Sequence, residues 1–271
     1  MRDIVERHRV RPASRVALRR ADPGDHSGCP RGKAAGRRRL RQLLRRLEAL
    51  QEALYAEHRH RVLVVLQAMD AGGKDGVIRS VFQGVNPQGV QVHCFKQPSA
   101  EELAHDFLWR VHQHVPGNGE IAIWNRSHYE DVLVVRVHDL APEKVWRARY
   151  GHIAAFETML AAEGTTILKF FLHISKQEQR RRLQERIDDP RKRWKFSSTD
   201  LRERTHWAEY QRGNAEMLGA TSSAQAPWFL VPADRNWYRD LVVAEVLVAA
   251  LDGLRIRLPK GDPGLRRRQV E

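Results

Sequence analysis

The chain has 271 residues, a formal net charge of +14 and an isoelectric point of about 10.4. This length allows one large domain with a complete core or two small domains. The charge predicts a polyanionic partner or substrate. Nucleic acid, polyphosphate, nucleotides and an acidic membrane surface all fit it, and so does a solvated basic surface without a ligand.

The two cysteines, Cys29 and Cys94, lie far apart in the sequence. Their separation matches neither a disulfide framework nor a zinc site, which favours a reducing compartment. The first twelve residues contain no apolar signal core, and no stretch approaches the roughly 20 apolar residues that span a bilayer. We therefore expect a soluble, cytoplasmic protein.

The N-terminal part of the chain falls into two stretches. Residues 1–36 are rich in Arg, Gly, Pro and Asp and show little periodicity, which predicts an extended basic arm. From residue 37 onward, leucines recur every three or four positions, as expected for an amphipathic helix. They are Leu40, Leu43, Leu44, Leu47, Leu50 and Leu54. This face is expected to pack on the domain core or on a sister subunit, whereas the stripe is short for a specific coiled-coil dimer.

Apolar strands alternate with helical patterns through most of the remaining chain. The predicted strands cover 62–66, 90–95, 121–124, 166–174 and 228–231. Helices are predicted at 77–82, 101–115, 130–135, 142–162, 176–187 and 241–254. Five buried strands connected by helices indicate an α/β fold of three layers around a central parallel five-stranded sheet. We assign residues 37–260 to this domain and 261–271 to a C-terminal tail.

A phosphate-binding loop is predicted directly after the first strand. The segment VLVVLQAMDAGGKDGVI, residues 62–78, contains Gly72, Gly73 and Gly76 in a turn, with Lys74 within it. Small residues let the backbone N–H groups face an anion, and the following helix adds the positive end of its dipole. Because ligands of parallel sheets bind at the carboxyl ends of the strands, the position of this loop suits a phosphate site.

The loop departs from the pattern G-x-x-x-x-G-K-[ST] at two positions. Ala68 replaces the first glycine and Asp75 replaces the hydroxyl residue, although Gly73 and Lys74 are retained. Carboxylates at Asp75 and Asp70 can bind magnesium directly or through water. Alternatively, Asp75 only caps the helix and Asp70 only forms a turn. The adjacent Gly73 and Lys74 favour the metal-binding interpretation.

A second polar segment, WNRSHYED at residues 124–131, follows the third predicted strand. Consecutive polar side chains after a buried strand are costly unless the site is wet or occupied by ions. Arg126 suits bidentate phosphate binding. Glu130 lies close enough in the sequence to contribute to the same metal site.

Residues 175–197 form the third candidate element, a basic segment that the Asp189-Pro190 pair divides in two. We interpret it as a helical lid that closes over phosphates, excludes water and neutralises charge in the transition state. Its predicted phosphate ligands are Arg182, Arg186 and Arg193. The alternative is a solvated charged helix face with pairs such as Glu178 with Arg182.

Four segments in this order resemble the family-2 polyphosphate kinases. They are QAMDAGGKDG at 67–76, IWNRSHYEDVLVVRVH at 123–138, RRRLQERIDDPRKRWKFS at 180–197 and APWFLVPADRNWYRDLVVA at 226–244. The resemblance runs from about residue 8 to residue 259. It implies a P-loop kinase fold similar to that of thymidylate kinases, and phosphate transfer between inorganic polyphosphate and nucleotides with magnesium.

The resemblance also implies roles for individual residues. Lys74 is expected to contact the transferring phosphate, and Asp70 to bind the metal or position the nucleophile. Arg126 and Arg186 are expected to bind phosphates. Together, Asp70, Lys74 and Arg126 form the predicted catalytic set.

One position indicates a subgroup of that family. Many members have an aspartate after the third strand, in a segment similar to FDRSWYNR, whereas this chain has Asn125 followed by SHYED. This version resembles the subgroup that phosphorylates both AMP and ADP. The resemblance then implies that Asn125 and Glu130 share metal binding with Asp70.

We therefore predict an enzyme that transfers the terminal phosphate of polyphosphate to AMP and ADP, in one or both directions. Mg²⁺ is the expected cofactor, with Mn²⁺ as an alternative, and GMP and GDP are further candidate acceptors. A homo-oligomer, either a dimer or a tetramer, is expected, with neither a specific nucleic acid nor a membrane as partner.

Two other functions remain open at this stage. The first is an ATP-dependent kinase of a small molecule or nucleotide. The second is a non-catalytic protein that binds polyanions or nucleic acid. The acids near the predicted phosphate site argue against the second, because a pure polyanion binder gains nothing from them. They are Asp70, Asp75, Glu130 and Asp131.

Overall fold

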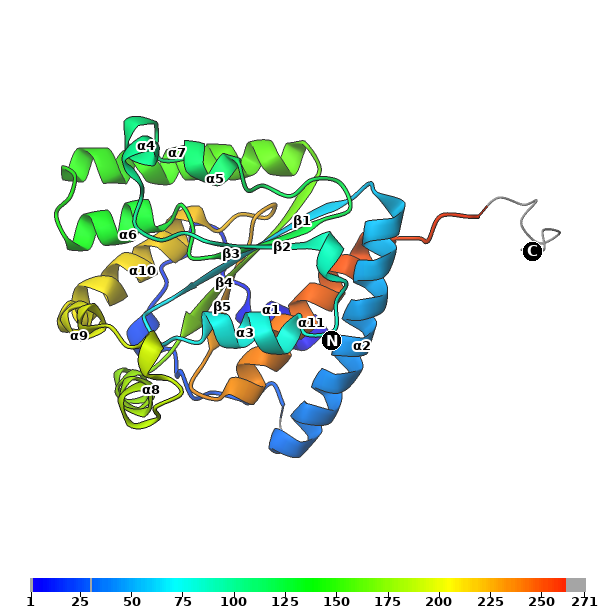
Figure 1. The fold of residues 1–271 in the computed structure, drawn as a ribbon, viewed down its shortest axis with the longest axis horizontal. Coiled ribbons are helices and arrows are strands. Elements are labelled where there is room, and N and C mark those ends of the chain that lie inside the picture. Colours follow the sequence, from blue (N-terminus) through cyan, green and yellow to red (C-terminus); the bar gives the residue numbers. More distant parts are fainter. Residues whose placement is uncertain (1, 30, 262–271) are drawn as a thin grey trace.

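A parallel five-stranded sheet forms the centre of the protein in the computed structural model, which describes residues 2–29 and 31–261 (Figure 1). The strand order is β2-β3-β1-β4-β5, and all neighbouring strands are parallel. The strands are β1 Arg61–Ala68, β2 Val90–Cys94, β3 Ile121–Asn125, β4 Thr165–His173 and β5 Trp228–Pro232. The prediction of five parallel strands is confirmed, and each strand lies within a few residues of its predicted position.

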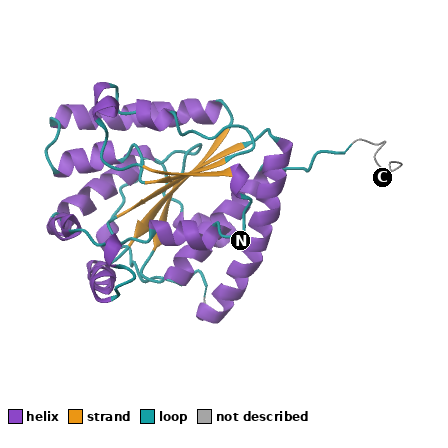
Figure 2. Cartoon of the chain, viewed as in Figure 1, coloured by secondary structure: helices purple, strands orange, loops and turns teal. Residues whose placement is uncertain are grey.

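Helices cover both faces of the sheet (Figure 2), which confirms the three-layer α/β architecture. One face is covered by α1 Arg2–His8, α2 Gly32–Glu57, α3 Lys74–Val81 and α11 Asn236–Gly253. The other face is covered by α5 Trp109–His112, α6 Glu130–Val137, α7 Glu143–Ala162 and α10 Trp207–Thr221. The remaining helical elements are η1 Leu18–Arg20, η2 Pro87–Gly89, α4 Ala100–Ala104, α8 Lys176–Asp188, η3 Arg193–Lys195 and α9 Ser198–Thr205.

The strands other than the edge strand β2 carry apolar side chains on both faces, as a sheet covered on both sides requires. In β1, Val62, Val64 and Leu66 belong to the core beneath α2 and α11, whereas Leu63 and Val65 belong to the core beneath α7. All five side chains are almost completely buried. The alternation fixes the register of β1, because a shift by one residue would exchange the two sets.

The leucine face of α2 packs on the domain core. Leu43, Leu47, Leu50 and Leu54 are buried in the same cluster as the apolar face of α11. The leucine stripe was expected to pack on the domain core or on a sister subunit, and these leucines pack on the core.

The N-terminal segment is folded onto the domain, so the expectation of an extended arm was wrong. Ile4 and Val5 of α1 are buried in the core, and Leu18 is buried on the other side of the sheet. The Val10 amide donates to the Trp228 carbonyl oxygen at 2.8 Å, beside the edge strand β5. These apolar residues are too few and too irregular to produce a periodic pattern, because each fills a separate tertiary contact.

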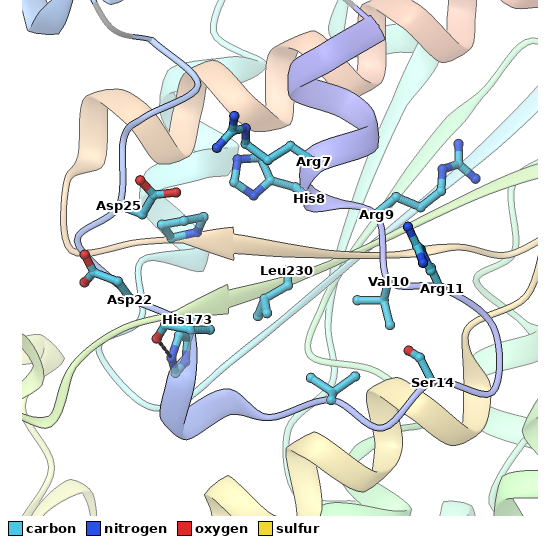
Figure 3. Close-up of a pocket in the computed structure, with 13 residues that line it drawn as sticks. Arg7, His8, Arg9, Val10, Arg11, Ser14, Asp22, Asp25, His173 and Leu230 are labelled. Atoms are coloured by element: carbon cyan, nitrogen blue, oxygen red, sulfur yellow. Dashed lines mark hydrogen bonds between the residues drawn. The ribbon is translucent and has the colours of Figure 1, made fainter.

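A cavity of about 380 Å³ lies between this N-terminal segment and β5 (Figure 3). Its walls include His8, His173 and Leu230, together with three arginines, Arg7, Arg9 and Arg11. The His173 ring contacts the Ala21 carbonyl oxygen at 3.2 Å, which connects the end of β4 to the N-terminal segment. None of the predicted phosphate-binding residues lines this cavity.

Several helices differ from the sequence predictions. The predicted helix 101–115 is two short helices, because a capping box at Ser99 starts α4 and the chain then turns before α5. Helices α9 and α10 were missed. Glycines within α10 weaken its helical pattern, and at Gly219 a Cβ atom would lie 2.3 Å from the Ser14 carbonyl oxygen.

The predicted C-terminal tail at 261–271 lies outside the described residues except for its first position. Within residues 2–29 and 31–261, no helix combines the length and the apolar character needed to cross a bilayer.

Candidate active site

The β1–α3 loop has the tight glycine geometry predicted for a phosphate site. Gly73 has φ +101°, in the left-handed region that favours glycine, and a Cβ there would lie 2.1 Å from Arg239 Nη1. At Gly72 a Cβ would lie 2.4 Å from the Ala68 Cβ. Helix α3 then begins at Lys74 without a side-chain cap, so the N–H groups of its first turn are available to an anion.

Lys74 lies within this loop and is almost buried, with 9% of its surface exposed. Its Nζ donates to the Ala68 carbonyl oxygen at 3.3 Å. Burial lowers the pKa of Lys74, and the nearby Arg126 acts in the same direction, whereas Asp70 and Glu130 oppose the shift. A phosphate placed here would compensate a positive charge that water does not solvate.

Arg126 lies between two carboxylates. Its Nη2 donates to Asp70 Oδ1 at 2.8 Å, and its Nη1 lies 3.8 Å from Glu130 Oε2. Glu130 is the main cause of the raised pKa of Arg126, which keeps the guanidinium charged. The backbone of Arg126 has φ +63°, and its amide donates to the Leu66 carbonyl oxygen at 3.1 Å. Strands β1 and β3 therefore bring Asp70, Arg126 and Glu130 to one place.

Asn125 and Asp75 complete the group on the side of α3. Asn125 Nδ2 donates to Asp75 Oδ1 at 2.8 Å. The other Asp75 oxygen lies 3.8 Å from Lys195 Nζ, which belongs to the basic segment. Asp75 is thus a link between the third strand and the predicted lid, in addition to its position in the first turn of α3.

The acidic residues are chemically suited to a hard divalent cation. Asp70, Asn125 and Glu130 offer oxygen ligands beside Lys74, although the described residues contain no cluster of three or more Asp, Glu, His or Cys side chains in metal-binding geometry. Mg²⁺ typically uses one or two carboxylates, several waters and the substrate phosphates. Asp70, Asn125 and Glu130 are therefore the residues that would hold such a cation.

The three arginines of the basic segment that we predicted to bind phosphate contact protein acceptors. Arg182 donates to the Ala71 carbonyl oxygen at 3.0 Å and to the Ala233 carbonyl oxygen at 2.5 Å, and it pairs with Glu178. Arg186 Nη1 contacts Asp200 Oδ2 at 3.0 Å. Arg193 Nε donates to the Ile187 carbonyl oxygen at 2.9 Å. Their phosphate binding remains a prediction, and Arg182 connects α8 to the glycine loop through the Ala71 carbonyl oxygen.

Three residues that support the loop were not predicted from the sequence. Gln67 Nε2 donates to Glu130 Oε1 at 2.8 Å, and Gln179 Nε2 donates to the Asp70 carbonyl oxygen at 3.0 Å. The buried Arg239 guanidinium lies against Gly73 and pairs with Asp240 at 2.7 Å. Gln67 had a signal, because it is a polar residue that directly follows the apolar run 62–66. Nothing in the local sequence distinguished Gln179 or Arg239 from neighbouring polar residues.

Comparison with known proteins adds independent observations. A family model described as polyphosphate kinase 2 matches residues 31–258. The AMP/ADP-polyphosphate phosphotransferase of Meiothermus ruber is 56% identical over 267 residues, which cover 98% of this chain and 100% of the relative. The ADP-polyphosphate phosphotransferase of Rhodopseudomonas palustris is 48% identical over 244 residues, which cover 86% of this chain and 84% of the relative.

A solved structure also matches over nearly the whole chain. The crystal structure of polyphosphate kinase 2 from Arthrobacter aurescens TC1 is similar with a TM-score of 0.93 at 42% sequence identity. The match covers 97% of this chain and 95% of that one.

Proposed function

This chain belongs to the polyphosphate kinase 2 family, and we propose that it transfers the terminal phosphate of inorganic polyphosphate to AMP and to ADP. It is a phosphotransferase with a P-loop kinase fold. The observation that carries the proposal is the convergence of Lys74, Arg126, Asp70 and Glu130 at the glycine loop. This arrangement combines cations for phosphate oxygens with oxygen ligands for a divalent metal.

The transfer is an in-line displacement at the terminal phosphorus of the polyphosphate chain. An oxygen of the nucleotide phosphate forms the new P–O bond, and the P–O bond to the chain breaks, so the chain becomes one phosphate shorter. The attacking oxygen is already anionic at neutral pH, and no strong general base is required. Lys74 and Arg126 then contribute by positioning the phosphates and neutralising charge in the transition state.

The family implies a divalent cation, and we infer that it is Mg²⁺, with Mn²⁺ as an alternative. When bound, the cation would neutralise charge on the phosphate oxygens. Asp70, Asn125 and Glu130 are the residues that would hold it. Their Arg126 and Asp75 partners keep these side chains at the loop.

The name of the Meiothermus ruber relative supports both AMP and ADP as acceptors. Asn125 and Glu130, at the carboxyl end of β3, are the residues on which we base the subgroup with two acceptors. GMP and GDP are further candidates. We also infer a cytoplasmic homo-oligomer, a dimer or a tetramer, whose contact lies away from the buried leucines of α2.

One assay tests the function. The purified protein is incubated with long-chain polyphosphate and Mg²⁺, and AMP, ADP, GMP or GDP is offered separately. Formation of ADP from AMP, and of ATP from ADP, is the expected result. Phosphorylation of a small molecule or nucleotide from ATP, with polyphosphate left intact, would instead identify an ATP-dependent kinase. Tight binding of polyphosphate or nucleic acid without turnover would identify a polyanion-binding protein.

A further inference from the structure

A cluster of buried polar side chains lies beneath the segment that carries Arg126 and Glu130. Its members come from three parts of the fold, and we call them the Lys169 cluster. They are Lys169 of β4, Glu157 of α7, and His128 and Tyr129 of the β3–α6 connection. The exposed fraction is 0% for Lys169, His128 and Tyr129 and 2% for Glu157.

The hydrogen bonds of Lys169 are complete. Its three N–H groups have three acceptors: the Tyr129 hydroxyl at 2.9 Å, the Thr221 carbonyl oxygen at 2.8 Å and the carboxylate of Glu157. The Tyr129 hydroxyl in turn donates to Glu157 Oε1 at 2.7 Å. Burial raises the pKa of Tyr129, so its hydroxyl keeps the proton that this bond requires.

Glu157 receives three contacts from the cluster. Oε2 accepts from Lys169, while Oε1 accepts from Tyr129 and lies 3.3 Å from His128 Nε2. Burial alone would raise the pKa of Glu157, but Lys169 and His128 outweigh this effect and hold it below its usual value. The carboxylate therefore stays charged and can hold two consecutive residues of the β3–α6 connection.

Site residues lie close to those two residues on both sides in the sequence. Arg126 precedes Ser127 and His128, and Glu130 follows Tyr129. Backbone bonds make the segment one compact turn, because the Glu130 amide donates to the Ser127 carbonyl oxygen at 3.0 Å. The buried side chains of His128 and Tyr129 hold this turn against Glu157 and Lys169. On the side that faces the glycine loop, Arg126 contacts Asp70 and Glu130 contacts Gln67.

A buried ion pair is weak evidence for stability, because apolar residues of similar volume are often as good or better. Apolar residues in place of Lys169 and Glu157 could not hydrogen-bond the Tyr129 hydroxyl and so could not fix its position. We propose that Lys169 and Glu157 are positioning residues for phosphoryl transfer, because they fix Tyr129 and thereby hold Arg126 and Glu130 at the glycine loop. This proposal rests on the proposed function.

Tyr129→Phe is the sharpest variant, because it removes one hydroxyl oxygen from the cluster. Lys169→Met combined with Glu157→Gln removes both charges together and leaves no uncompensated ion. Tyr150→Phe is the matched control, since Tyr150 is buried in the same apolar core but lies outside the Lys169 cluster. All variants are checked by circular dichroism and thermal melting before use.

Steady-state kinetics should separate positioning from general destabilisation. We expect Tyr129→Phe to lower kcat with polyphosphate about 10-fold and to change the KM for AMP less than threefold, since small misplacements cost rate. In an Arg126→Ala background, Tyr129→Phe should lower kcat less than about threefold further, because one of the two residues that it positions is gone. Tyr150→Phe should retain wild-type kcat.

Hydrogen–deuterium exchange tests the same proposal without turnover. The amides of residues 126–130 should exchange at least about 10-fold faster in Tyr129→Phe and in the double variant, while Tyr150→Phe should match the wild type. An inactive wild-type enzyme would contradict the proposed function, and this exchange experiment would still judge the positioning. Unchanged exchange in 126–130, or equal losses of kcat with and without Arg126, would overturn it.

Discussion

The glycine loop and the basic segment 175–197 hold their positive charges in different ways. At the loop, Lys74 contacts a backbone carbonyl oxygen at 3.3 Å, and Arg126 keeps 39% of its side chain exposed beside Asp70. In the basic segment, Arg182 and Arg186 contact fixed acceptors on the protein. All three guanidinium nitrogens of Arg182 donate to protein acceptors, whereas Arg126 donates through Nη2 to Asp70. Arg182 therefore has less to offer to a phosphate, and the loop should carry most of the catalytic effect.

The two regions also differ in whether neighbouring residues or distant parts of the chain determine their structure. The loop geometry follows from residues next to one another, since Gly72 and Gly73 permit the turn and Lys74 begins the helix. The basic segment depends on contacts made far along the chain, such as the bond from Arg182 to the Ala233 carbonyl oxygen. Substitutions in the two regions should therefore differ in both size and kind.

The largest effect is expected for Lys74→Ala. Removing the cation at the loop should lower kcat by about 10³-fold or more, because charge stabilisation at the transferring phosphate is lost. Turnover is measured with polyphosphate, Mg²⁺ and AMP. Lys33→Ala, at an exposed position of α2, is the control for loss of a lysine. Near-normal turnover of Lys74→Ala would contradict a catalytic role of the glycine loop.

Asp70→Asn should have the second largest effect. The change keeps the shape of the side chain but removes a charge beside Arg126, and we expect kcat to fall about 10²-fold. The Mg²⁺ concentration for half-maximal rate should rise at the same time. Asp139→Asn is a suitable control, because Asp139 is exposed and its φ of +51° also suits asparagine. An unchanged Mg²⁺ titration would contradict the metal-binding role of Asp70.

Stability should depend on pH through an acid of the site segment. Burial raises the pKa of Asp131 to about 6 from an ordinary value of 3.8. The folded state then binds more protons than the unfolded state between about pH 4 and pH 6, so the free energy of unfolding falls as pH rises through this window. The shift corresponds to about 2 to 3 kcal/mol.

Asp131→Asn should remove this dependence. The difference in free energy of unfolding, variant minus wild type, should rise between pH 4 and pH 6 and level off above pH 7, as followed by urea denaturation. Asp189→Asn in the basic segment is the comparison, because a hydrogen bond from Arg191 lowers the pKa of Asp189. Its difference should fall rather than rise with pH, and the change should lie below about pH 4, because a lowered pKa leaves Asp189 ionised above that pH in both states. A flat profile for Asp131→Asn would contradict the raised pKa.

The smallest effect is expected in the basic segment. Arg193 is exposed and bonds to the Ile187 carbonyl oxygen, so Arg193→Ala should raise the KM for polyphosphate about two- to fivefold and leave kcat nearly unchanged. The KM of the wild type should rise steeply with salt, because many screened contacts contribute, and less steeply in the variant. Arg193→Lys, which keeps the charge, should lie close to the wild type. If Arg193→Ala lowered kcat as much as Lys74→Ala, this result would contradict the expected difference in catalytic effect between the glycine loop and the basic segment.

Much of the fold could be predicted because local patterns determine it. Four of the five strands, all but β2, are mainly apolar runs, and α7 and α8 begin within a residue of their predicted starts. The N-terminal segment could not be predicted, because Val10 and Leu18 are held by tertiary contacts that leave no periodic pattern. Helix α10 was missed for a related reason, since close packing on the N-terminal segment requires its Gly219.

The candidate site likewise contains residues that the sequence indicated and residues whose roles it did not indicate. The sequence identified Lys74, Arg126 and Asp70, which the fold brings together at the ends of neighbouring strands. It did not indicate that Arg182 would connect α8 to the loop, because that role depends on acceptors at Ala71 and Ala233. Lys169 is a lysine within the apolar strand TTILKFFLH, a visible signal of a buried partner that only the fold could identify.

Phosphorus NMR of a complete reaction tests the central claim most directly. Wild-type protein is mixed with polyphosphate of defined length, Mg²⁺ and AMP, and all phosphorus species are followed until the reaction stops. The account predicts that each phosphate lost from the chain appears in ADP or ATP, with little free orthophosphate, and that Lys74→Ala leaves the spectrum unchanged. Release of orthophosphate without nucleotide product, or intact polyphosphate beside wild-type enzyme, would contradict it.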